Sequence, residues 1–168
     1  MKKTVLFTLL LCGLGFSLLH ANTPQTDSVK SNTPAYLSHE QYMAYTKASP
    51  LGMVLIAETN NYPSPKKALQ YAQQLNLSSV QKMQITQILN EMTRKAKEMD
   101  NFILAQESKL NTLFKEQKIN EGSLIFYTNK IGALQGELRN AYLKAHIATK
   151  KVFSATQLQK YKQLAVVN

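Results

Sequence analysis

The chain has 168 residues and carries 20 Lys and Arg against 10 Asp and Glu, a formal net charge of +10. The length fits a single domain, and the single cysteine leaves no internal disulfide to stabilise it. The sequence contains no glycine-rich phosphate loop, which disfavours a nucleotide-dependent activity.

The first 21 residues have the pattern of a secretory signal peptide. A charged start, Met1–Lys3, precedes the apolar run Thr4–Leu19, and Ala21 stands where a signal peptidase cuts. The run is shorter than the roughly 20 residues that span a bilayer, although a permanent N-terminal anchor is the alternative. Lipid attachment at Cys12 is disfavoured by the bulky Leu11 before it. Cleavage would remove two lysines, lowering the net charge to +8, and we expect an exported, periplasmic protein without a transmembrane span.

Short elements follow the signal peptide. Residues 22–37 are polar, so we expect a disordered leader before a domain over residues 38–168. Ser38 and Gln41 have capping-box spacing and predict a helix from His39 to Ala48. The apolar stretch Leu51–Thr59 predicts a helical turn or two, because a lone strand has nothing to pair with.

A proline-marked helix leads into the longest elements. Ser64 as cap and Pro65 at the first position predict a helix that runs to Leu75. Two long amphipathic helices between Ser79 and Val152 follow, with a break at Lys118–Gly122. Apolar or small residues recur there at steps of three and four, with Gln106 as the one polar residue on the first register. They are Ile85, Ile88, Met92, Ala96, Met99, Ile103, Leu110 and Leu113, and Leu124, Tyr127, Ile131, Leu134, Leu138, Ala141, Ala145, Ala148 and Val152.

Neither long helix can bury its apolar stripe alone. We therefore predict an all-α protein built on a long antiparallel helical hairpin with short flanking helices. Two helices form a thin layer with little core, so we also expect a homodimer.

Two similar motifs flank this hairpin. Leu77, Ser78 and Gln81 precede the first long helix in the sequence LSSVQ. Phe153, Ser154 and Gln157 follow the second in FSATQ, and open a terminal helix that runs through Leu164. Each Ser-x-x-Gln predicts a capping box behind an apolar residue.

These two motifs resemble the paired Leu-Thr-x-x-Gln motifs of the Spy/CpxP superfamily of periplasmic proteins, which includes CnrX-like heavy-metal sensors. Serine replaces threonine in both motifs and Phe153 replaces leucine in the second, which keeps the hydroxyl cap and the apolar contact. The similarity covers about Ser38 to Leu164. It implies an all-helical hairpin, often a curved antiparallel dimer, with chaperone or envelope-stress roles, while some members bind or sense metal.

His146 is the candidate metal ligand. The metal-sensing relatives place paired ligands four residues apart on this helix, but here the neighbours at that spacing are Lys150 and Tyr142. Only His39 remains as a second histidine after signal cleavage, and zinc requires three or four ligands. We expect a structural His146 and no cofactor, with a divalent transition metal as the alternative.

Other side chains have simpler interpretations. Helical spacing predicts that Met83, Met92 and Met99 pack in the core. The acidic residues of the first long helix are interpreted as helix surface, with ion pairs Glu91–Lys95 and Arg94–Glu98. The same interpretation includes Asp100 and Glu107.

The sequence offers no catalytic constellation, so we expect no enzyme. Lysines along both arms predict a positive surface that attracts acidic partners. The expected function is an ATP-independent periplasmic chaperone or envelope-stress adaptor. Its partners would be unfolded or acidic client proteins or the periplasmic domain of a membrane sensor, and not nucleic acid. The alternative is a periplasmic heavy-metal-binding sensor or resistance protein.

Overall fold

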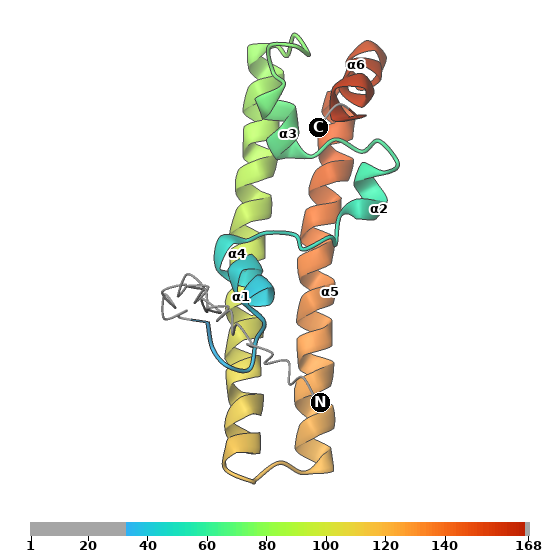
Figure 1. Cartoon of the computed structure of the whole chain (residues 1–168). Helices are drawn as coiled ribbons and strands as arrows, with labels where there is room; N and C mark the ends of the chain where they lie inside the picture. Colours follow the sequence, from blue (N-terminus) through green and yellow to red (C-terminus); the bar gives the residue numbers. More distant parts are fainter. Residues whose placement is uncertain (1–32, 167–168) are drawn as a thin grey trace, which may run out of the picture. The chain divides into compact units, whose positions relative to one another are not determined.

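The chain divides into two units, Met1–Ser31 and Asn32–Asn168, and the computed structural model describes residues 33–166 of the second. The signal peptide expected at residues 1–21 and most of the leader expected at residues 22–37 lie outside the described residues. The described part is all-helical, as predicted (Figure 1). Its helices are α1 (His39–Lys47), α2 (Leu55–Glu58), α3 (Pro65–Gln70), α4 (Ser79–Lys115), α5 (Glu121–Val152) and α6 (Ala155–Val166). No helix among residues 33–166 is long and apolar enough to cross a membrane.

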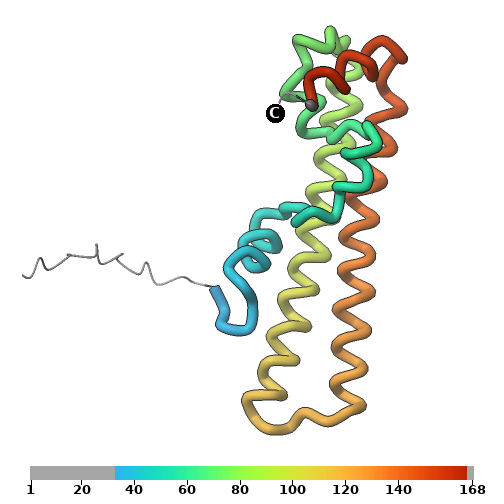
Figure 2. Tube along the Cα trace, turned by 45° about the vertical axis from the view of Figure 1, so that its right-hand side comes forward, coloured from blue at the N-terminus to red at the C-terminus, as the bar shows by residue number. Residues whose placement is uncertain are grey.

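Helices α4 and α5 form the predicted antiparallel hairpin (Figures 1 and 2). The 37 residues of α4 extend over roughly 55 Å at 1.5 Å per residue. A short connection after Lys115 ends at Asn120, whose side chain caps α5 through the backbone N–H of Ser123 at 2.9 Å. The break therefore lies slightly earlier than predicted, and Gly122 belongs to the first turn of α5.

The segment α1–α3 runs along one face of this hairpin, with α1 against α4 and α3 against both long helices (Figure 2). Two apolar clusters result. The central cluster joins α1 and the α2 region to the hairpin through Leu37, Tyr45, Val54, Ala96, Met99, Ile103, Leu138 and Tyr142. The basal cluster joins α3, α4 and α6 through Ala68, Leu75, Leu77, Ile85, Phe153 and Tyr161.

The apolar stripes are partly as predicted. Ile85, Ala96, Met99 and Ile103 of α4 and Ile131, Leu138 and Ala145 of α5 are buried. Two predictions were wrong: Leu124 is 39% exposed and Met83 is 56% exposed. Met83 is two residues before the buried Ile85 and therefore points to nearly the opposite side of α4. Leu124 lies near the turn of the hairpin, where none of residues 104–130 is buried.

The short elements also differ from the prediction in detail. The helix at Pro65 ends at Gln70, not Leu75, and Ser64 occupies the cap position without a side-chain bond. Asn76 adopts φ +50, and this turn lets both Leu75 and Leu77 enter the basal cluster. In a continuous helix two residues so spaced would point to nearly opposite sides. The predicted helical turn within Leu51–Thr59 is present as α2.

Ordered structure begins before the predicted domain boundary at residue 38. Leu37 is buried in the central cluster, and its N–H donates to the carbonyl of Pro34 at 3.0 Å. The end of the expected leader is thus held by the same apolar packing as α1. The Ser38–Gln41 capping box is present as predicted.

Candidate functional site

The two Ser-x-x-Gln motifs meet at the base of the hairpin, the end opposite the α4–α5 turn. Ser78 accepts the N–H of Gln81 at 3.1 Å, and Ser154 accepts the N–H of Gln157 at 3.2 Å. The N–H of each serine in turn donates to Oε1 of the glutamine, so both capping boxes are complete. The motif spacing predicted these local bonds.

The glutamine amides also bind each other, which sequence spacing did not reveal. Gln81 Nε2 lies 2.8 Å from Gln157 Oε1, and Gln157 Nε2 lies 3.1 Å from Gln81 Oε1. Gln81 Nε2 further donates to the carbonyl of Val152 at 2.9 Å, and Gln157 Nε2 to that of Leu75 at 3.3 Å. We call this reciprocal pair the glutamine clamp. It ties the starts of α4 and α6 to the end of α5.

The apolar motif residues Leu77 and Phe153 pack beside the clamp. Both are buried in the basal cluster, and the Phe153 ring contacts that of Tyr161 edge-on with centroids 6.0 Å apart. The Tyr161 hydroxyl accepts the N–H of Ser64 at 3.2 Å. All six motif residues therefore serve the architecture of the hairpin base.

His146 is buried, 3% exposed, on the side of α5 that faces the segment α1–α3. Its Nδ1 lies 2.9 Å from the carbonyl oxygen of Tyr142, which can only accept a hydrogen bond. Nδ1 therefore carries a proton, and Nε2 is the ring nitrogen that presents a lone pair when the ring is neutral. Nε2 and the Tyr142 hydroxyl are both buried without a hydrogen-bond partner in the described part of the chain. Each such group costs about 1–3 kcal/mol of stability.

Both side chains line a cleft of about 510 Å³, which we call the His146 cleft. It lies between the α1–α2 connection, α3 and the hairpin. Its lining combines three lysines and one carboxylate with apolar walls, and includes Lys47, Lys66, Lys67, Glu58, Pro50, Val54 and Met92.

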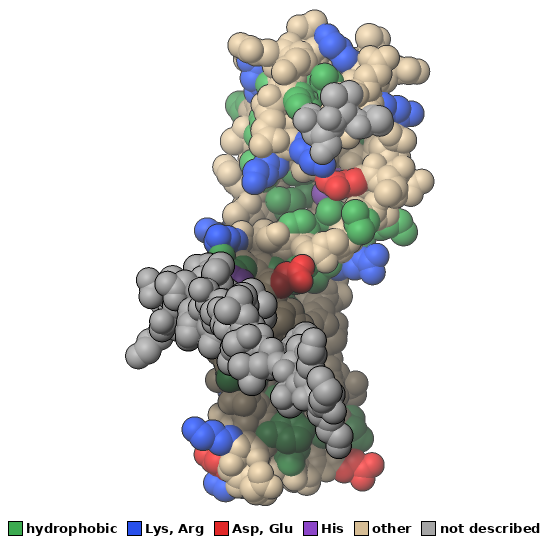
Figure 3. Space-filling view, in the orientation of Figure 1, with side chains coloured by type: hydrophobic (Ala, Val, Ile, Leu, Met, Phe, Trp, Pro, Cys, Tyr) green, Lys and Arg blue, Asp and Glu red, His purple; other side chains and the backbone are tan. Residues whose placement is uncertain are grey.

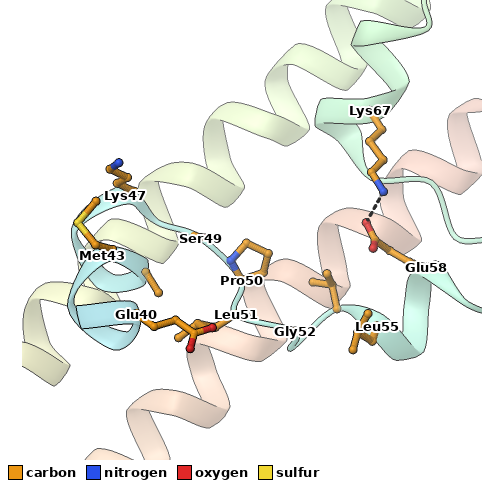
Figure 4. A pocket seen from close by; sticks show the side chains of 12 residues that line it. Glu40, Met43, Lys47, Ser49, Pro50, Leu51, Gly52, Leu55, Glu58 and Lys67 are labelled. Atoms are coloured by element: carbon orange, nitrogen blue, oxygen red, sulfur yellow. Dashed lines mark ion pairs between the residues drawn. The ribbon is translucent and has the colours of Figure 1, made fainter. Parts of the chain in front are cut away.

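A second, outer cleft of about 720 Å³ lies on the α1–α2 connection (Figure 4). Lys47, Ser49, Pro50 and Val54 line both clefts, as do Glu58 and Lys67, whose side chains form an ion pair at 3.4 Å. The connection is strained, since Ala48 and Leu51 adopt φ +47 and +44, a region that costs non-glycine residues roughly 1–2 kcal/mol. Strain of this kind concentrates at functional sites.

Asp100 is not on the helix surface, contrary to the prediction. It is 1% exposed, and its Oδ2 has no hydrogen-bond partner among residues 33–166. Burial raises the pKa of this carboxyl to about 7, and burial together with the nearby Asp100 charge raises the pKa of the Tyr142 phenol. The helical spacing of α4 could have predicted this burial, since Asp100 lies four residues after Ala96 and three before Ile103, both of which are buried.

Of the other carboxylates of α4, Glu91 and Glu98 form ion pairs, whereas Glu107, also predicted at the surface, is half-buried and its pKa is raised by burial. Arg94 pairs with Glu98 at 3.2 Å as predicted, and with Glu91 at 2.7 Å. Lys95 pairs with Glu98 at 3.3 Å rather than with Glu91. The hydrogen bond from Arg94 holds the pKa of Glu91 below its usual value.

No group of three or more His, Cys, Asp or Glu that could hold a metal ion occurs within residues 33–166. His39 does not join His146: its Nδ1 lies 3.0 Å from the hydroxyl of Thr33, and its side chain is exposed. Glu58 and Met92 line the His146 cleft, but Glu58 is held by Lys67.

The end of the hairpin near the turn has a different surface. None of residues 104–130, which we call the distal hairpin, is buried. Phe114 is 50% exposed, Ile125 53% and Phe126 60%, and the last ring stacks edge-on against Tyr127 at 5.1 Å. Figure 3 shows hydrophobic side chains on this end of the visible face, with basic and acidic side chains around the turn. Exposed apolar side chains gathered in this way are typical of interaction surfaces.

Comparison of the chain with protein-family models, with curated proteins and with solved structures finds no match. The fold itself defines the class of protein, an all-helical hairpin whose centre is covered by a short N-terminal helical segment.

Proposed function

We propose that the protein is an ATP-independent chaperone or adaptor of the bacterial envelope, which holds unfolded or partner polypeptide on the distal hairpin. The observation that carries this proposal is the exposure of Phe114, Ile125 and Phe126 on two helices that bury no side chain between residues 104 and 130. Such side chains would bind apolar segments of a client without requiring a defined sequence.

Charge supports the same proposal. Residues 33–166 contain 17 Lys and Arg against 9 Asp and Glu, an excess that attracts acidic polypeptides over a distance. Capture would therefore have two stages, a salt-sensitive encounter and an apolar contact. At physiological ionic strength, salt largely screens the attraction between charges that are more than about 8 Å apart.

An aggregation assay tests the proposal. The purified protein at a one-to-one ratio should suppress aggregation of reduced α-lactalbumin, an acidic test client, at low salt. The triple variant Phe114→Ser, Ile125→Ser, Phe126→Ser should lose most of this suppression. No suppression by the unmodified protein at low salt would contradict the proposal.

A matched control removes exposed apolar side chains elsewhere. Val80, Met83 and Ile147 are 58%, 56% and 47% exposed and lie outside the distal hairpin. Serine at all three positions should leave suppression intact, with helix content checked by circular dichroism. Equal losses in the two triple variants would show that apolar exposure in general, and not the distal hairpin, binds the client.

We also propose that two copies associate through the groove between α4 and α5 that no residue of α1–α3 lines. This groove of about 440 Å³ contains Ala141, Ala145 and Ala148, small residues that permit close helix approach. Its rim carries both signs of charge on both helices, which suits a two-fold contact. Sedimentation equilibrium should show a dimer that Ala141→Arg weakens and Ala133→Arg, at an exposed position outside the groove, does not. Only monomer at tens of micromolar would contradict this.

A further inference from the structure

The His146 cleft has the features of a small-molecule site that the proposed client surface does not use. Its volume of about 510 Å³ lies within the range of ligand pockets in proteins. The distal hairpin begins at residue 104, whereas no α4 residue beyond Met92 lines the cleft, so the two surfaces are separate.

Two buried residues that line the cleft, Tyr142 and His146, carry hydrogen-bonding atoms without a partner among residues 33–166. Since Nδ1 donates to the Tyr142 carbonyl, Nε2 of His146 offers a lone pair in the neutral form of the ring. The Tyr142 hydroxyl, on a side chain that also lines the cleft, can donate and accept. Buried polar atoms are nearly always satisfied, so this pair indicates a ligand that donates a hydrogen bond within the cleft.

The exposed end of the cleft is positive. Lys47, Lys66 and Lys67 line it against the single carboxylate of Glu58, which already pairs with Lys67. Among residues 33–166, Lys47 and Lys66 form no ion pair. This charge attracts an anion and opposes a metal cation at the Nε2 lone pair.

The wall between the two ends is held in a strained conformation. Ala48 adopts φ +47 while its N–H and that of Ser49 both donate to the Ala44 carbonyl. A left-handed alanine persists only where its surroundings hold it. Here it places Pro50 and Val54 as an apolar side of the cleft.

We propose that the His146 cleft binds a small organic anion, whose carboxylate or phosphate contacts Lys47 and Lys66 and whose hydroxyl or amide N–H donates to His146 Nε2. The short body between these groups would lie against Pro50 and Val54. The ligand class is thus a hydroxylated or amide-bearing organic acid or phosphate ester.

Nitrogen-detected NMR of the full-length protein labelled at its histidine rings tests this proposal. Mandelate supplies a hydroxyl and a carboxylate, and glucose 6-phosphate a hydroxyl and a phosphate. Sulfate supplies negative charge without a hydroxyl donor, and glucose supplies hydroxyl groups without charge. We expect mandelate or glucose 6-phosphate to shift the Nε2 signal of His146 saturably below millimolar concentration, and the two single-feature probes to bind at least about tenfold more weakly.

Variants locate the binding. Lys47→Gln with Lys66→Gln should weaken the bound probe about tenfold, whereas Lys82→Gln with Lys109→Gln, two exposed lysines elsewhere, should not. The proposal is overturned if neither two-feature probe shifts His146 at 10 mM, or if both double variants bind alike. It is also overturned if Zn²⁺ shifts His146 at micromolar concentration while the anions do not, since the cleft would then be a metal site.

Discussion

The buried carboxyl of Asp100 makes a quantitative prediction about stability and pH. Burial raises its pKa from 3.8 to about 7, a shift of roughly three units. Each unit corresponds to about 1.36 kcal/mol, so the free energy of unfolding should fall by about 4 kcal/mol as this group ionises.

The direction follows from proton binding. Between the two pKa values the folded state binds more protons at Asp100 than the unfolded state does. The contribution of Asp100 is therefore fully favourable below pH 3.8 and is lost as pH rises through 7. Between pH 4.5 and 8.5, about 3 kcal/mol of this loss should develop.

The perturbation is Asp100→Asn, which keeps the shape and removes the titration. Any cost of burying the amide is the same at both pH values, so it cancels in the comparison. The free energy of unfolding is measured for both proteins by urea titration of the helical circular dichroism signal. Between pH 4.5 and 8.5, the stability of the variant relative to that of the unmodified protein should rise by about 3 kcal/mol.

Glu91→Gln is the control of opposite sign. The pKa of Glu91 is lowered by Arg94, so its contribution to stability is present at high pH and is lost as pH falls through its folded pKa. At pH 8.5 the unfolding free energy of this variant should therefore not exceed that of the unmodified protein. If Asp100→Asn and the unmodified protein differ by a constant amount at both pH values, the reasoning about the buried carboxyl is refuted.

Two further predictions concern the clamp and the strained connection. Gln81→Ala removes the bonds to Gln157 and to a buried carbonyl, and should cost about 1–3 kcal/mol of unfolding free energy. Gln84, an exposed glutamine three residues later in α4, is the control. If Gln81→Ala lowers the unfolding free energy no more than Gln84→Ala does, the clamp is not stabilising. Ala48→Gly should raise the unfolding free energy by up to about 1 kcal/mol, because glycine adopts φ +47 without strain. The same change at Ala105, exposed within α4, should lower it by about 1 kcal/mol, and urea titration distinguishes the two signs.

Local patterns predicted most of the fold. The steps of three and four gave the two long helices, and Ser38, Ser78 and Ser154 gave three helix starts through their capping boxes. These features depend on residues within one turn of each other, so a single sequence contains them. The end of α3 was missed because it depends on burying Leu75 and Leu77 together in a cluster built from distant helices.

The candidate sites were harder to predict because each depends on tertiary packing. His146 drew attention as a metal ligand, yet its tautomer and its cleft are defined by Tyr142 and by a segment about 90 residues earlier. Asp100 was assigned to the surface because neighbouring carboxylates pair with cations there. Its place on the register with Ala96 and Ile103 pointed to the interior, but the charge of the residue obscured that signal.

The glutamine clamp also bears on the order of folding events. It joins side chains 76 residues apart in sequence, whereas the bonds within α4 and α5 close over single turns. Helical turns form within about a microsecond, but the amide pair can form only after both arms and α6 have docked. Loss of Gln81 should consequently accelerate unfolding while leaving the refolding rate nearly unchanged, a signature of contacts absent from the transition state.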